Sequence, residues 1–130
     1  MAEGGYSAGE MNGEPGGRFD FPAFKRAFVT QDVSKWLDFY ADDAEWIEYK
    51  QTHPPRSPRR IVGKKEIAEF LAHVTASNVL LEIDDEIIGP TRAAFCLWYT
   101  LGDGRRIVEH IIIHFDDGKI TRQVDVEAWD

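Results

Sequence analysis

The chain has 130 residues, 43% of them hydrophobic and 29% charged, which predicts one globular domain with a core of its own. Its formal net charge of −8 at pH 7 argues against nucleic acid or an anionic membrane as a partner, because both require a positive surface. A single cysteine, Cys96, excludes an intramolecular disulfide and any metal site with several cysteine ligands, and it is typical of a reducing compartment.

The first 17 residues are rich in glycine and contain few large apolar side chains, so we expect a flexible tail outside the fold. The N-terminus lacks the apolar segment of a secretory signal, and no stretch reaches the length of a membrane helix. We therefore expect a cytoplasmic protein in which residues 18–130 form the folded domain.

Two short helices are predicted at the start of this domain, over residues 19–29 and 32–41. Aromatic side chains recur there at helical spacing, and Asp32 has the position and residue type of a helix N-cap. The pair Asp42 and Asp43 is expected to mark the end of the second helix.

A short strand is predicted next, over residues 45–50, because Trp46 and Glu48 alternate there with Ile47 and Tyr49. Residues 51–62 hold three prolines and several arginines, and they are predicted to form a loop, since proline cannot donate a hydrogen bond within a sheet. A third helix is predicted over residues 66–74, where apolar side chains recur at i, i+3, i+4 and i+7.

The remainder of the chain is predicted to be a meander of four antiparallel strands. Segments rich in glycine and aspartate separate the predicted strands at 79–88, 92–101, 105–115 and 119–127. The order of helices and strands predicts an α+β domain with its helices packed on one face of a curved sheet.

Three segments in this order resemble the nuclear transport factor 2-like superfamily and its SnoaL-like branch. They are Phe-Tyr-Ala-Asp-Asp-Ala at 39–44, Gly-Lys-Lys-Glu-Ile at 63–67 and Asp-Gly-Lys-Ile at 117–120. The resemblance extends from about residue 19 to the C-terminus. It implies a cone-shaped half-barrel of mostly antiparallel strands, three helices on its concave side, a deep apolar pocket and a homodimer. Because the fold hosts isomerases, polyketide cyclases and non-catalytic binding domains, it does not by itself select an activity.

Glu48 is the first candidate for acid/base chemistry. It shares a strand face with Trp46, and a carboxyl against an aromatic wall has its charged form disfavoured, which raises its pKa toward neutrality. The resemblance also places Glu48 where ketosteroid isomerases of this fold keep their general base. The alternative is that Trp46 and Glu48 face solvent, while Ile47 and Tyr49 point into the core.

Two groups of the isomerase have no counterpart in this chain. The tyrosine that donates a hydrogen bond to the steroid oxyanion aligns with Phe24, and an aspartic acid donor aligns with about Ile111. Without these donors an enolate would lose its main stabilisation, so steroid isomerisation is not predicted.

The resemblance to SnoaL-like cyclases selects Asp125 as the acid/base residue, with Gln123 as a polar anchor on the same strand face. In that family an acidic residue abstracts a proton from carbon before a cofactor-independent ring closure, and a histidine assists. A three-residue loop at 116–118 would place Glu109 opposite Asp125, whereas a two-residue turn would place His110 there as the catalytic partner. The alternative is that Gln123 and Asp125 belong to a solvated strand face.

Four aromatic side chains are candidate walls of a pocket for a small apolar or aromatic ligand: Trp36, Tyr40, Trp46 and Trp98. No metal site and no cofactor are predicted. His110 and His114 lie on a predicted strand, where four residues span about 13 Å, too far for one ion. Two functions stay open at this point: a cofactor-independent isomerase or cyclase using carboxylates, and a non-catalytic domain that binds a ligand or a protein partner.

Overall fold

The computed structural model describes residues 18–75 and 79–130, and the predicted tail at 1–17 lies outside the described residues. The described helices are α1 (Phe21–Val29), α2 (Val33–Leu37) and α3 (Lys64–Val74). The described strands are β2 (Tyr40–Tyr49), β3 (Arg59–Val62), β4 (Leu80–Ile88), β5 (Arg92–Thr100), β6 (Arg106–Asp116) and β7 (Lys119–Trp129). None of the described helices combines the length and the apolar character needed to cross a membrane.

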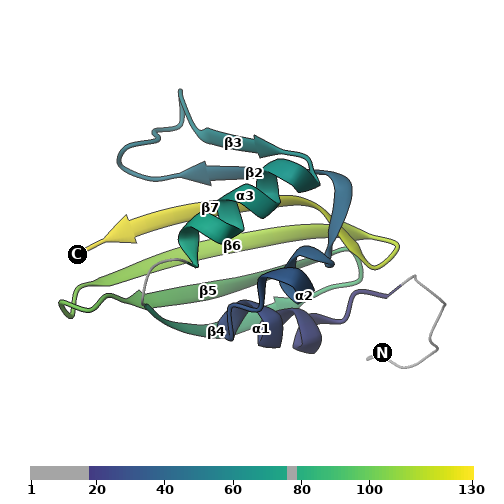
Figure 1. The fold of residues 1–130 in the computed structure, drawn as a ribbon, viewed down its shortest axis with the longest axis horizontal. Helices are drawn as coiled ribbons and strands as arrows, with labels where there is room; N and C mark the ends of the chain where they lie inside the picture. The colour runs from purple at the N-terminus through teal and green to yellow at the C-terminus, as the bar shows by residue number, and fades with distance from the viewer. Residues whose placement is uncertain (1–17, 76–78) are drawn as a thin grey trace.

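The six strands form one sheet in the order β3-β2-β7-β6-β5-β4, and the helices lie together on one of its faces (Figure 1). Strands β2 and β7 pair in parallel, while the other neighbouring strands pair antiparallel. The predicted α+β architecture, an open, curved and mostly antiparallel sheet with three helices on its concave side, is confirmed.

Helices α1 and α2 begin at aspartate caps. Asp20 accepts a hydrogen bond from the backbone N–H of Ala23 at 3.0 Å, and Asp32 accepts one from the backbone N–H of Lys35 at 3.4 Å. Each cap satisfies a backbone donor that has no partner inside the helix. The prediction that Asp32 caps the second helix is therefore confirmed.

A cluster of phenylalanine rings forms the core between α1 and the sheet. Phe24 lies within it and is fully buried, with its ring centroid 5.6 Å from that of Phe28 and 6.1 Å from that of Phe95. Such tilted and edge-to-face pairs contribute stability beyond the burial of apolar surface. Phe24, which aligns with the tyrosine donor of the isomerase, thus packs in the core.

Two predicted boundaries between the second helix and the third are wrong. Strand β2 starts at Tyr40, so Asp42 and Asp43 lie within a strand instead of ending a helix, and α2 ends at Leu37. Strand β3 also lies within the predicted loop, since its backbone pairs with β2 and places Ile61 opposite Trp46. The prolines precede β3, and β3 is an edge strand, so they remove no hydrogen bond from the sheet.

The hairpin between β6 and β7 has a register that neither sequence alternative contained. The turn at Asp117 and Gly118 has two residues, both with positive φ, as a tight hairpin turn requires. The register then shifts, because Ile120 pairs with Phe115 whereas Arg122 pairs with His114, which leaves Thr121 as an extra residue on β7.

This shift decides which residues surround Asp125. Asp125 is paired with Ile111, and Glu109 lies two residues before Ile111 on β6, on the same face of the sheet. His110 pairs with Val126 on the opposite face and is exposed. The expectation that His110 stands beside Asp125 is therefore wrong.

Candidate active site

A cavity of about 240 Å³ lies between α3 and the helix-covered face of the sheet. Its aromatic walls are formed by Phe28, Trp36, Trp46, Phe70, Tyr99 and Trp129. Its acidic residues are Glu48, Glu109, Asp125 and Glu127, contributed by β2, β6 and β7. Trp46 and Glu48 therefore point inward, as one of the two sequence alternatives expected, and they are 3% and 5% exposed.

Asp125 is held by hydrogen bonds to both of its oxygens. The Trp46 indole Nε1–H donates to Oδ2 at 2.9 Å, and the Gln123 amide Nε2–H donates to Oδ1 at 3.1 Å. The Tyr40 hydroxyl donates to the Gln123 carbonyl oxygen at 2.5 Å, which fixes the orientation of that amide. All four side chains are buried. The carboxylate is thus fixed in position before any ligand arrives.

The buried acids Asp125 and Glu109 differ in how readily they ionise. Burial raises the pKa of Asp125 from its ordinary 3.8 to about 7, although the hydrogen bonds from Gln123, Trp46 and Glu109 act in the other direction. Burial, and then the charge of Asp125, holds the pKa of Glu109 well above its usual range. The pair therefore combines a protonated Glu109 with an Asp125 that gains or loses its proton near neutral pH.

Glu48 and Glu127 lie closer to cations of the chain than Asp125 does. The Arg59 Nε atom is 3.1 Å from the Glu48 Oε1 atom, although its N–H does not point at that oxygen well enough to form a hydrogen bond. The Lys50 Nζ atom is 3.9 Å from Glu48 and 3.7 Å from Glu127. Burial raises the pKa of Glu48, and the charge of Lys50 opposes that change. Of the two predicted acid/base residues, Asp125 is the better placed to accept a proton.

Two predicted site residues lie on the wrong face of the sheet. Trp98 pairs with Val108 on the face away from the helices, and the Arg106 guanidinium covers its ring at 4.4 Å. Trp98 is therefore no wall of the cavity, and His110 lies on the same outer face, where it pairs with Cys96. The other predicted walls do meet near Asp125: Tyr40 stacks on Trp46 at 5.8 Å, and Trp36 lines the cavity.

Several residues of the site were not selected from the sequence. Glu109 had entered only as one alternative of the hairpin register, although it is the charged member of an otherwise apolar series of buried alternate residues on β6 that includes Ile107 and Ile111. A charged residue within such a series is itself a signal of an unusual environment. Arg59 gave no such signal, because it follows a proline-rich segment and was therefore predicted to lie in a loop instead of in β3.

Two groups of side chains within the described residues bring possible metal ligands together. In the cavity, the carboxyl groups of Glu48, Glu109 and Glu127 have ligand atoms within 4.8 Å of one another. Lys50 and Arg59 already compensate charge there, and a protonated Glu109 is a poor ligand. The arrangement is therefore better suited to proton transfer than to holding a cation.

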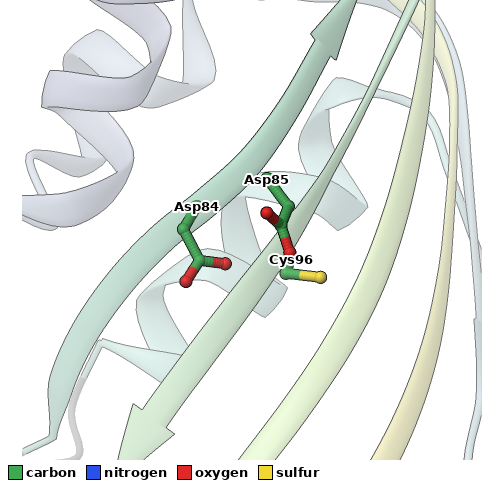
Figure 2. A group of neighbouring side chains, drawn as sticks. All are labelled: Asp84, Asp85 and Cys96. Carbon is green, nitrogen blue, oxygen red and sulfur yellow. The ribbon is translucent and has the colours of Figure 1, made fainter.

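The second group lies outside the cavity, where Asp84 and Asp85 on β4 stand beside Cys96 on β5 (Figure 2). Burial, and then the charges of Asp85 and Asp84, raise the pKa of the Cys96 thiol. The reactive and metal-binding form of cysteine is the thiolate, so this environment makes Cys96 a weaker nucleophile and ligand than an ordinary cysteine.

Residues 22–123 match the family model of the SnoaL-like domain. A candidate ketosteroid isomerase from Kribbella flavida is 19% identical, with a TM-score of 0.70 over 85% of this chain and 74% of that chain. An NTF2-like protein of unknown function from Mesorhizobium loti is 15% identical, with a TM-score of 0.71 over 83% and 87%. A candidate isomerase from Bacillus subtilis is 21% identical, with a TM-score of 0.65 over 83% of each chain. No curated protein sequence matches this one.

Proposed function

The chain belongs to the SnoaL-like domain family, and we propose that it is a cofactor-independent enzyme that transfers a proton at carbon in a compact, largely apolar substrate. The observation that carries the proposal is the environment of Asp125. This buried carboxyl has a pKa of about 7, is held by two N–H donors and lies in an aromatic cavity. A general base is most effective when its pKa is close to the working pH.

Asp125 and Glu109 have complementary roles in this proposal. Ionised Asp125 accepts the proton from carbon, and its fixed orientation removes the need to reorganise during the reaction. Glu109 retains its proton because it is buried beside that charge, and it donates this proton in a hydrogen bond to Asp125, which stabilises the ionised base. Returning the proton from Asp125 to a different carbon would complete an isomerisation, and ring closure of the carbanion would complete a cyclisation.

The size of the cavity restricts the substrate. Its volume of about 240 Å³ is below the roughly 300–1,000 Å³ of sites for drug-sized ligands. We therefore favour a substrate with one or two rings over a polycyclic polyketide. The aromatic walls suit a flat, apolar body, and the carboxyl groups suit a single polar end.

The pH dependence of proton abstraction tests this function without knowledge of the natural substrate. The probe is 5-nitrobenzisoxazole, a small aromatic carbon acid that a carboxylate base converts to a coloured cyanophenolate. Because Asp125 must be ionised, kcat/KM is expected to rise with pH and to reach half of its plateau near pH 7. The measurement is a pH series of initial rates, corrected for the buffer reaction.

Two outcomes would contradict the prediction. A midpoint near pH 4 would mean that an ordinary, exposed carboxylate performs the reaction. Binding of the probe without turnover above the buffer rate would support the alternative of a non-catalytic ligand-binding domain.

We also propose that two copies of the chain associate through the outer face of the sheet. Ile112 on β6 and Val126 on β7 are 44% and 55% exposed there, beside the partly buried Val108 and Val124. Exposed apolar surface of this kind is characteristic of an interface.

Ile112→Glu is expected to convert a dimer to a monomer in multi-angle light scattering, because an unpaired charge would be buried at the contact. Ala72→Glu, on exposed α3 surface, is the control and should leave the dimer intact; a monomeric wild type would refute the proposal.

A further inference from the structure

Trp36 carries a buried N–H donor that forms no hydrogen bond of proper geometry with the described residues. Its side chain is 3% exposed, its indole Nε1–H forms no hydrogen bond, and it lines the cavity that contains Asp125. Most buried N–H groups in folded proteins are paired, because leaving one unpaired costs free energy. An unpaired donor in the wall of a cavity therefore indicates that a ligand supplies the acceptor.

The indole is held in position by its neighbours. It stacks on Phe28 with ring centroids 4.3 Å apart, and Phe28 belongs to the phenylalanine core. Burial raises the pKa of Tyr40 well above its usual range, and the nearby Trp36 N–H opposes that change, but no hydrogen bond of proper geometry joins the two side chains. The Tyr40 hydrogen is itself donated to Gln123. The ring is therefore fixed by its packing, with its N–H near an oxygen that it does not meet at hydrogen-bonding geometry.

The position of Trp36 relative to the carboxylate gives this donor a chemical use. Trp36 and Asp125 both line the cavity. The Trp36 N–H lies near Tyr40, which stacks on Trp46, and the Trp46 indole donates to Asp125. A base removes a proton from carbon more easily when a second group stabilises the charge that moves onto a nearby oxygen. Phe24 in the core and Ile111 beside Asp125 carry no donor for that purpose.

We propose that the Trp36 indole N–H binds an oxygen atom of the substrate and stabilises the negative charge that develops there when Asp125 takes the proton. The binding part of this proposal requires only that a ligand carries an oxygen acceptor. The catalytic part rests on the function proposed above. The substrate would then present a carbonyl or ring oxygen toward α2 and an acidic C–H toward β7.

The binding half is tested by comparing two ligands of nearly equal shape, the ketone 1-indanone and the hydrocarbon indane. In a ¹H–¹⁵N spectrum of the wild-type protein, the Trp36 indole signal is identified as the one that Trp36→Phe removes. Titration with 1-indanone is expected to move this proton signal downfield, because the N–H gains an acceptor, and indane is expected to leave it nearly in place. Equal shifts with the two ligands, or no shift with either at saturating concentration, would overturn the proposal.

The variant Trp36→Phe provides the second measurement, since it removes the donor and retains an aromatic ring. Its affinity for 1-indanone is expected to fall about 3- to 10-fold, with little change for indane. Its kcat/KM for 5-nitrobenzisoxazole is expected to fall on the order of 10-fold or more, because the developing phenolate oxygen loses a donor. The pH midpoint should remain that of the wild type, since Asp125 is unchanged.

Trp98→Phe is the matched control, because Trp98 lies on the outer face and does not line the cavity. It should change neither the preference for the ketone nor the rate.

The two proposals fail in different ways. If Asp125 is not the base, the ketone preference persists without the pH midpoint near 7; if Trp36 is not the donor, the midpoint persists and Trp36→Phe retains the ketone preference.

Discussion

Replacing Asp125 with Asn is expected to lower kcat/KM for 5-nitrobenzisoxazole by about 100- to 10,000-fold, the usual contribution of a positioned general base. Asn has nearly the same shape but cannot accept the proton. Its side-chain oxygen can still accept one of the hydrogen bonds that Trp46 and Gln123 donate to Asp125. The loss should therefore appear in the rate of proton abstraction, with the cavity preserved. Initial rates at pH 8, where wild-type Asp125 is mostly ionised, give the clearest comparison.

Stability measurements distinguish this effect from unfolding. The pKa of Asp125 rises from 3.8 to about 7 on folding, so between these values the native state binds a proton that the unfolded state releases. The free energy of unfolding of the wild type should thus fall as pH rises through this window, by on the order of 4 kcal/mol. In Asp125→Asn this contribution is absent, so the part of the pH dependence of stability that comes from Asp125 should disappear.

The matched control is Asp84→Asn, an exposed position on β4 outside the cavity. It removes the same charge from the chain and should change neither the rate nor the slope of stability with pH. If Asp125→Asn kept more than a tenth of the wild-type rate while folded, Asp125 would not be the base, and Glu48 would become the residue to test.

The largest loss of stability is expected from Phe24→Ala, at about 3–5 kcal/mol. Phe24 is fully buried, and its ring contacts those of Phe28, Phe39 and Phe95, so truncation leaves a cavity that no single neighbour can fill. For a domain of this size, whose total stability is typically 5–15 kcal/mol, that is a large fraction. Urea unfolding followed by circular dichroism measures the change.

Leu80→Ala is the control for this substitution. Leu80 is 62% exposed, so its truncation should cost less than about 0.5 kcal/mol. Losses of similar size for the two variants would mean that the aromatic cluster is not the centre of the core. A smaller loss for Phe24→Ala with normal turnover would mean that α1 repacks without disturbing the cavity.

Much of the architecture could be predicted because long periodic segments report local structure directly. The helix now observed at Lys64–Val74 and the four strands of the meander were predicted within a few residues of their bounds. Strand β3 was missed because it has only four residues and directly follows a proline-rich segment. The start of β2 was missed because its partner is distant in the sequence, since Tyr40 pairs with Ile120, eighty residues further along.

The site could be predicted only in part, because face assignments depend on contacts between strands. The inward orientation of Trp46 and Glu48, and of Gln123 and Asp125, was among the alternatives and is confirmed. Trp98 was expected to line the cavity, but it lies on the outer face of the sheet together with Cys96 and His110. Nothing within its own strand distinguishes the two faces, since apolar residues occupy both.

The extra residue at Thr121 has a consequence for how this site can be gained or lost in evolution. Thr121 and Arg122 are consecutive exposed residues, after which the alternation of β7 resumes with Gln123 and Asp125 inward. Whether the Asp125 carboxylate points inward thus depends on whether the number of residues between the turn and Asp125 is odd or even. Deleting one exposed, chemically inert residue would exchange the inner and outer side chains of the strand beyond it. Among relatives of this chain, a gap of one residue at this point is therefore a stronger sign of altered chemistry than a substitution there.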